Sequence, residues 1–322
     1  MLISFFLIGC HKNNPIETEN NNQNNIHTWI KVMNGLETNV NYIITSVDSN
    51  IYAFGGHGLY SSSDNGELWN LVSAGPPIST YVITGRENYL FAGTSGNGLY
   101  ISSDLGVNWF ESTNNDSLPD YVYSIAVDPE YLYVGAGNDA EVFRSSDLGN
   151  SWSSFHNGFP IITPVHFLRI NLLVKNNNLL FAYPFDSGIY FSDDNGVNWQ
   201  SMNDGLYDDY DLWSFAVSDS FYFATEESMN RGVYRRNFNG SNWIKIYNIT
   251  DFNPHFIVAQ SSTVLASADS GIVISFNNGN TWNSCNKGLD DPTHSYFYYA
   301  IIHDNYVFAV SFREAIYRYS LK

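Results

Sequence analysis

The sequence predicts an all-β protein, a seven-bladed β-propeller whose blades have four strands each. The first evidence is a period of tryptophans: Trp29, Trp69, Trp109, Trp152, Trp199, Trp243 and Trp282 are separated by 40, 40, 43, 47, 44 and 39 residues. Trp213 is the only tryptophan outside this series. Such a period, filled with short strands, is typical of propeller blades. The second observation is a turn motif before most of these tryptophans, and the third is an unpaired strand at each chain end.

The turn motif has the pattern S-x-D-x-G-x-x-W. Its five copies are Ser62, Asp64, Gly66, Trp69; Ser102, Asp104, Gly106, Trp109; Ser145, Asp147, Gly149, Trp152; Ser192, Asp194, Gly196, Trp199; and, with Asn for Asp, Ser275, Asn277, Gly279, Trp282. The Asp side chain can accept hydrogen bonds from N–H groups of its own turn, and Gly tolerates positive φ. We expect each copy to be a structural hairpin turn. Its Trp should begin the next strand and pack into the core.

The chain ends indicate the number of blades. Residues 297–320 supply three strands and then lack the turn motif and a fourth strand. Residues 29–33 have the pattern of a fourth strand with no strands before it. Pairing the two segments covers two sheet edges that would otherwise be open to aggregation. We therefore expect six blades from internal repeats and a seventh, the last, that is closed by the N-terminal strand at Trp29.

Composition excludes several classes of partner. The 322 residues include 32 acidic and 14 basic side chains, a net charge of −18, which argues against nucleic acid or an anionic membrane surface. The histidines lack the spacing of metal ligands, and no phosphate loop or nucleophile elbow occurs. We expect no metal, no cofactor and a monomer.

The N-terminus predicts export. Residues 1–9 are an apolar run, and Leu7-Ile8-Gly9-Cys10 resembles the bacterial lipobox, although no Lys or Arg precedes the run. The resemblance implies a signal peptide over residues 1–9, a lipid on Cys10 and a place in the cell envelope, either outer membrane, periplasm or cell surface. Residues 10–26 continue as an Asn-rich tether and residues 27–322 form the propeller. Cys285 would then be unpaired and buried.

The turn motif resembles the Asp box of BNR-repeat propellers in the sialidase superfamily. In such propellers the turns lie on the face opposite the binding face. Sialidases have six blades, three convergent arginines, a Tyr–Glu nucleophile pair and an acidic Asp. This chain has no F/Y-R-I-P motif beyond a loose similarity at Phe167-Leu168-Arg169-Ile170. Arg169, Arg231 and Arg313 are the arginines expected on the binding face.

Two other families have a similar fold. Xyloglucanase-type hydrolases use two tandem propellers with catalytic carboxylates in the cleft between them, and this chain supplies one propeller. Photosystem II assembly factors are non-catalytic and are expected to have a basic surface, whereas this chain is acidic.

The candidate binding residues lie in the loops of the expected binding face: Asp208, Asp209, Asp211, Trp213, Glu226, Arg231 and Arg313. The aspartates suit acid–base hydrolysis, Ca²⁺ binding or, beside Trp213, a sugar ring. The simpler interpretation, which the sequence favours, is a solvated loop in which Trp213 packs into the core. The sequence favours a non-catalytic envelope lipoprotein that presents its propeller to a protein or glycan. The alternative is a glycoside hydrolase, either sialidase-like or using a pair of carboxylates.

Overall fold

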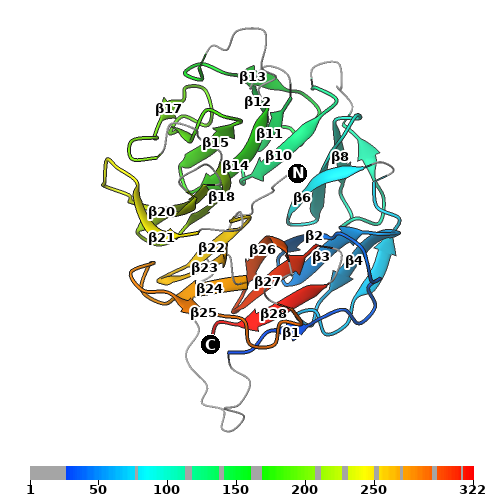
Figure 1. The fold of residues 1–322 in the computed structure, drawn as a ribbon. Helices are drawn as coiled ribbons and strands as arrows, with labels where there is room; N and C mark the ends of the chain where they lie inside the picture. The colour runs from blue at the N-terminus through cyan, green and yellow to red at the C-terminus, as the bar shows by residue number, and fades with distance from the viewer. Residues whose placement is uncertain are drawn as a thin grey trace, which may run out of the picture.

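A computed structural model describes residues 27–76, 79–112, 118–137, 141–160, 169–206, 212–226, 231–249, 254–268, 271–291, 296–312 and 315–322. These residues form seven four-stranded antiparallel sheets around a common axis, and they contain no helix (Figure 1). The prediction of a seven-bladed β-propeller is confirmed. The expected signal peptide, Cys10 and the tether lie outside the described residues.

The blades follow one another along the chain. In blades 1 to 6 the strand order in the sheet is the order in the sequence, whereas in blade 7 the N-terminal strand β1 is the fourth strand, beside β28. Blade 1 has β2 (Ile43–Val47), β3 (Asn50–Gly55), β4 (Gly58–Ser62) and β5 (Asn70–Ser73); blade 2 has β6 (Thr80–Arg86), β7 (Tyr89–Thr94), β8 (Leu99–Ser102) and β9 (Phe110–Glu111); blade 3 has β10 (Val122–Val127), β11 (Leu132–Ala136), β12 (Val142–Ser145) and β13 (Ser153–Phe155). Blade 4 has β14 (Ile170–Asn176), β15 (Leu179–Pro184), β16 (Tyr190–Ser192) and β17 (Gln200–Ser201); blade 5 has β18 (Leu212–Val217), β19 (Phe221–Glu226), β20 (Gly232–Asn237) and β21 (Ile244–Asn248). Blade 6 has β22 (Ile257–Gln260), β23 (Thr263–Ala268), β24 (Gly271–Ser275) and β25 (Asn283–Ser284), and blade 7 has β26 (Phe297–His303), β27 (Tyr306–Ser311), β28 (Ile316–Ser320) and β1 (Ile30–Lys31).

The ring closes where the sequence predicts. β1 pairs antiparallel with β28, with Ile30 opposite Arg318 and Lys31 opposite Tyr317. The first strands of the blades form the inner ring, and each contacts the first strand of the next blade, β26 contacting β2 at the seam. Both chain ends therefore belong to one blade, and the fold has no open blade at its seam.

The S-x-D-x-G-x-x-W copies form the turns between third and fourth strands, and we call them the repeated turns. In the first, Ser62 Oγ donates to Asp64 Oδ1 at 2.7 Å, and Asp64 Oδ1 accepts from the N–H of Leu68 at 3.0 Å. Gly66 has a φ of 83° and donates its N–H to Ser62 Oγ. In the copy with Asn277, the amide oxygen accepts the same two kinds of hydrogen bond. The structural role expected for these turns follows from this geometry.

The tryptophans of the period are not equally buried. Trp29, Trp69, Trp199 and Trp243 are at most 4% exposed. Trp109, Trp152 and Trp282 also pack against core clusters, but they are only partly buried. The backbone N–H groups of Trp29, Trp69, Trp199 and Trp243 donate to the preceding blade.

The core lies between neighbouring sheets rather than along the axis. Blades 7 and 1, for example, share a cluster that contains Tyr42, Ile44, Tyr299 and Phe308. Cys285 is buried between blades 6 and 7 and forms no disulfide within the described part of the chain. None of the described segments is a helix that is long and apolar enough to cross a membrane.

Candidate functional site

Five of the seven inner strands have a bulge at the same place. The strand register shifts at Tyr81, Tyr123, Asn171, Trp213 and Tyr298, each of which has no partner on the second strand. A bulge bends the strand and redirects a side chain. The bulge recurs in different blades, so the redirected side chains lie at equivalent places around the ring.

The corresponding positions in the two other blades are Tyr42 and His255. Trp213 lies two residues before Phe215, which pairs with Ala224 of the second strand. By the same rule Tyr42 lies two residues before Ile44, and His255 two residues before Ile257. We call these seven residues the mouth positions: Tyr42, Tyr81, Tyr123, Asn171, Trp213, His255 and Tyr298. All except Asn171 carry a ring.

The mouth positions lie at the start of the inner strands. The repeated turns and the hairpins between first and second strands lie at the other end of the sheets, because antiparallel strands alternate in direction. The mouth positions are therefore on the face opposite the repeated turns, where inner strands surround the axis.

Blades 2 to 4 contribute a stack of rings and a cation to this face. Tyr123 stacks on Tyr81, with ring centroids 5.5 Å apart, and on Tyr121, at 6.3 Å. The guanidinium of Arg169 lies over the ring of Tyr123 at 5.2 Å and over that of Phe185 at 4.8 Å. Two cation–π contacts hold the Arg169 side chain in one place. Within the described part of the chain, its guanidinium makes no hydrogen bond or ion pair.

Blades 5 to 7 contribute a second group of rings. Trp213 and His255 meet edge to face at 4.5 Å, and His255 lies 4.1 Å from the ring of Tyr296. His255 is 3% exposed, and burial lowers its pKa to about 4, so the imidazole is neutral at pH 7. Its Nδ1 lies 3.1 Å from the hydroxyl of Tyr296. When that hydroxyl donates, Nε2 carries the ring proton.

Among the buried polar atoms of blades 4 to 6 that have no hydrogen-bond partner within the described residues are four near the mouth: Arg169 Nε, Asn171 Oδ1, Trp213 Nε1 and His255 Nε2. Buried polar atoms usually have a partner, so each such atom requires an explanation. These four belong to, or lie two residues from, the mouth positions of consecutive blades. The arrangement is suited to a ligand that supplies both hydrogen-bond donors and acceptors.

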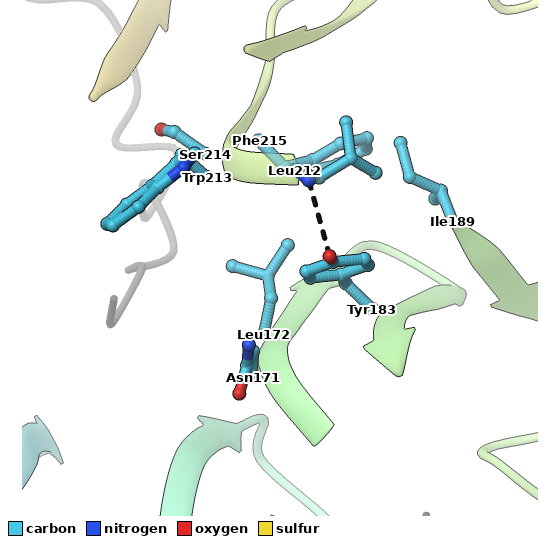
Figure 2. Close-up of a pocket in the computed structure, with 8 residues that line it drawn as sticks. All are labelled: Asn171, Leu172, Tyr183, Ile189, Leu212, Trp213, Ser214 and Phe215. Carbon is cyan, nitrogen blue, oxygen red and sulfur yellow. Dashed lines mark hydrogen bonds between the residues drawn. The ribbon is translucent and has the colours of Figure 1, made fainter. Parts of the chain in front are cut away.

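A small pocket between blades 4 and 5 lies beside two mouth positions. Figure 2 shows Asn171 and Trp213 on the side of the pocket away from Ile189, with Trp213 directed away from Tyr183. The hydroxyl of Tyr183 accepts a hydrogen bond from the N–H of Leu212 at 3.3 Å. The volume of about 10 Å³ has room for roughly one water molecule. A larger ligand would therefore lie across the mouth rather than enter this pocket.

The candidate residues from the sequence lie in different places. Asp208, Asp209, Asp211 and Arg313 are outside the described residues. Trp213 is partly exposed at a mouth position, which departs from the interpretation that it packs into the core. Arg231 is partly buried just before β20.

Glu226 does not reach the surface. It is 0% exposed at the end of β19, where it is paired with Leu212 and Gly232. Burial and a hydrogen bond with Glu226 raise the pKa of Tyr234 well above its usual value. The structure therefore brings Trp213 to the mouth but places Glu226 inside blade 5.

Sequence reasoning missed Tyr81, Tyr123, Asn171, His255 and Tyr298. The repeats were aligned on the tryptophan that starts the fourth strand, and this register does not compare the first strands. In every blade, one residue of the first strand pairs with an Ala or Val of the second strand. When the first strands are aligned on that residue, the position two residues before it carries a ring in six blades.

A hydrogen-bonded Tyr–Glu pair, one requirement of a sialidase, does occur in blade 1. The hydroxyl of Tyr60 donates to Glu37 Oε1 at 2.7 Å, and His57 Nδ1 lies 2.7 Å from Glu37 Oε2. Burial and the Glu37 carboxylate raise the pKa of Tyr60 to about 12. A tyrosine nucleophile needs a lowered pKa, so this pair is suited to structure rather than to catalysis. Among the described residues, no group of three or more His, Cys, Asp or Glu could hold a metal ion.

Comparison with protein families supplies an identity for the domain. The profile of the DUF6242 beta propeller domain matches residues 6–204, more than half of the chain. This chain belongs to that family. Comparison with curated protein sequences gives no match.

Among solved structures, YCF48 bound to D1 peptide has a TM-score of 0.71 and 14% identity, covering 93% of this chain and 98% of that one. The extracellular domain of the one component system BT4673 from B. thetaiotaomicron has a TM-score of 0.71 and 14% identity, covering 91% and 40% of the two chains. An ancestral GH74 enzyme has a TM-score of 0.66 and 18% identity, covering 90% and 46%. The DUF6242 chain thus spans less than half the length of the last two. At these identities the likeness shows the fold alone.

Proposed function

We propose that this DUF6242 propeller is a non-catalytic binding module of the bacterial cell envelope that holds a protein or glycan partner at the mouth positions. The observation that carries the proposal is the set of partly exposed rings at equivalent bulges of four blades, Tyr81, Tyr123, Trp213 and Tyr298, with Arg169 between two rings. The rings of Tyr42 and His255, at the corresponding positions of two other blades, are buried. Binding sites combine aromatic surface with a few placed polar groups. The unpartnered atoms of Arg169, Asn171, Trp213 and His255 supply such groups.

A structural neighbour supports a binding role. YCF48, a propeller of similar fold, is known in a structure with a D1 peptide bound. We transfer from it only the idea that a single propeller of this size can hold a partner without a second domain. The GH74 enzyme is about twice as long as the matched part, which is consistent with activity that needs more than one propeller.

The location is part of the proposal. The apolar start and Cys10 support a lipid anchor followed by a tether, with the membrane contacted only through the lipid. Metabolic labelling with a palmitate analogue in a bacterial host should mark the wild-type chain and leave Cys10→Ser unlabelled. Equal labelling of both chains would contradict the anchor and leave the binding role untouched.

The binding role is tested with glycan and peptide arrays probed by the full chain and by Trp213→Ala. We expect a defined set of ligands whose signal falls at least about fivefold in the variant, because a ring and its N–H are both lost. Turnover of chromogenic glycosides by wild type would instead support a glycoside hydrolase. The absence of any ligand sensitive to Trp213→Ala would refute the mouth as the binding site.

A further inference from the structure

We infer that the ligand of the mouth is a glycan that carries a carboxylate, and that Arg169 binds this carboxylate. The inference rests on the proposed function, because it names the chemical class that the same site would take. It is carried by Arg169, which lies between two rings without a hydrogen-bond acceptor, and by buried, unpartnered atoms at the mouth positions of blades 4 to 6.

Arg169 differs from the arginines that hold the blades together. Arg144 and Arg318 donate through Nη1 to the backbone oxygens of Asn195 and Asn65 in the next blade, at 2.8 and 2.7 Å. Arg235 donates in the same way to Asn278. Arg169 has two aromatic contacts but no acceptor within the described residues. In a chain with 32 acidic and 14 basic residues, a guanidinium without an acceptor is unexpected.

The geometry of Arg169 favours a planar anion. The rings of Tyr123 and Phe185 cover the guanidinium, so the N–H groups at its edge are the groups left to bind. A guanidinium edge matches a carboxylate with two parallel N–H···O bonds. The rings also fix the side chain before the ligand arrives, which lowers the entropy lost on binding.

The unpartnered atoms at the mouth positions of blades 4 to 6 favour a sugar as the carrier of the carboxylate. Trp213 Nε1–H is a donor and Asn171 Oδ1 an acceptor, and both are buried without partners. His255, 97% buried, has its Nε2 unpartnered as well. A sugar hydroxyl both donates and accepts, so a row of hydroxyls on one ring can satisfy such a mixture. The C–H face of the same ring can pack on Trp213 or Tyr123.

The charge of the protein limits the number of carboxylates. A net charge of −18 repels a densely charged polyanion, whereas a single carboxylate among neutral sugars meets Arg169 locally. The class we infer is therefore a mixed glycan with isolated uronic acid residues. A peptide ligand is the competing outcome of the test.

The test is calorimetric titration of the full chain with uronic acid-containing oligosaccharides and with the same oligosaccharides after reduction of the carboxyl to an alcohol. We expect at least about tenfold tighter binding of an acidic form than of its reduced form, from the loss of one charge-assisted pair. Arg169→Gln should remove this difference. Arg169→Lys, which keeps the charge but not the fork, should retain part of it. Lys31→Gln is the control, because it removes one positive charge on the outer strand β1, 44% exposed.

The outcomes separate the inference from the function. Equal binding of acidic and reduced forms, or unchanged binding by Arg169→Gln, would overturn the inference that Arg169 binds a carboxylate. The binding role would still stand if Trp213→Ala loses the ligand. A peptide that binds the mouth in place of any glycan would overturn the inference in the same way. If no ligand depends on Trp213, both fail. Thermal melts of each variant show whether lost binding reflects lost folding.

Discussion

The junctions between blades are of two kinds, which differ in how a tryptophan of one blade meets the preceding blade. At the close junctions, blade 6 with 7, 7 with 1, 3 with 4 and 4 with 5, the backbone N–H of Trp29, Trp69, Trp199 or Trp243 donates to the preceding blade, at distances of 2.7–2.9 Å. At the open junctions, 1 with 2, 2 with 3 and 5 with 6, the tryptophans are Trp109, Trp152 and Trp282. These three are the partly exposed ones.

A glycine makes the close junction possible. Gly35, Gly158, Gly205 and Gly288 each lie at positive φ immediately after the residue that accepts the tryptophan N–H. At each of them, an added Cβ would overlap the carbonyl oxygen of that tryptophan. Each of these glycines lies six residues after a tryptophan of the period, namely Trp29, Trp152, Trp199 and Trp282. Backbone can therefore approach backbone only where glycine occupies this place.

The open junctions use side chains instead. The hydroxyls of Ser73 and Ser112 donate to the backbone oxygens of Gly106 and Gly149 in the next blade, both at 2.6 Å. Between blades 5 and 6, Arg235 donates to Asn278 and Asn280. Arginines make a similar contact at two close junctions, so only the contact from the tryptophan N–H distinguishes the two kinds there. Two open junctions also lie under ring pairs of the mouth, Tyr81 with Tyr123 and Trp213 with His255. Part of the candidate binding surface therefore also joins blades that lack the close contact.

Replacing the tryptophan by alanine should give the largest difference in stability between close and open junctions. Trp69 is 2% exposed and its Nε1 donates to the oxygen of Val32 at 3.0 Å, so we expect Trp69→Ala to cost about 3–5 kcal/mol. Trp109 is partly exposed and its Nε1 has no partner among the described residues, so Trp109→Ala should cost about half as much. Chemical denaturation of both variants measures the difference. Equal losses would remove the distinction between close and open junctions.

Adding one methyl group at the glycine should have the next largest effect. Gly205 has a φ of 91°, and Gly205→Ala places a Cβ against the carbonyl oxygen of Trp243. We expect the free energy of unfolding to fall by about 3 kcal/mol from overlap and backbone strain together. Gly96→Ala is the matched control, because Gly96 also has positive φ but no atom lies within 4 Å of its Cβ. Denaturant midpoints that shift equally for both would mean that backbone strain alone decides the cost.

Removing a side-chain contact at an open junction should have a moderate effect. Ser112→Ala loses the bond to the oxygen of Gly149 and the acceptor of the Trp152 N–H, 3.3 Å away. We expect about 1–2 kcal/mol, because a buried acceptor is left unpaired. Ser151→Ala, in an exposed turn of the same blade pair, serves as the comparison. A loss at Ser112 no greater than at Ser151 would show that the hydroxyl does not join the blades.

Acid should affect the repeated turns in both kinds of junction alike, and only slightly. Hydrogen bonds lower the pKa of Asp64, chiefly from the N–H of Leu68, and that of Asp147, chiefly from the hydroxyl of Ser151. A lowered folded-state pKa gives stability that is complete above the unfolded value of about 3.9 and is lost as pH falls through the folded value. We expect Asp147→Asn to reduce the fall in melting temperature below pH 4 by about 1–3 °C. Asn277 already fills this place in blade 6. Identical pH profiles would show that the carboxylate contributes nothing in acid.

Prediction from sequence succeeded where a residue acts within its own turn or strand. The repeated turn needs Ser, Asp and Gly within a few residues, so its structure is visible in the motif itself. The pairing of the N-terminal strand after Trp29 with the last strand was predicted by counting the strands at the two ends of the chain. The sequence did not show that Trp109 packs against the core only partly buried, because the degree of burial depends on the blade before it.

The candidate site was the least predictable part. Trp213 was found because it follows a cluster of aspartates, and Glu226 was taken for a surface residue although it is fully buried. The rings at Tyr81, Tyr123 and His255 are far apart in sequence. They become neighbours only because the inner strands close around an axis.

By itself, then, the sequence determined the all-β class, the seven blades, the turn geometry and the closing strand, since each depends on local hydrogen bonding and on a period along the chain. The tertiary structure alone decided which glycines meet a tryptophan backbone, which tryptophans are buried and which rings gather at the mouth. Those properties depend on contacts between blades, and a repeat in the sequence describes a blade but not its neighbour. The unpartnered state of Arg169 is of the same kind, because it depends on what surrounds the side chain in space.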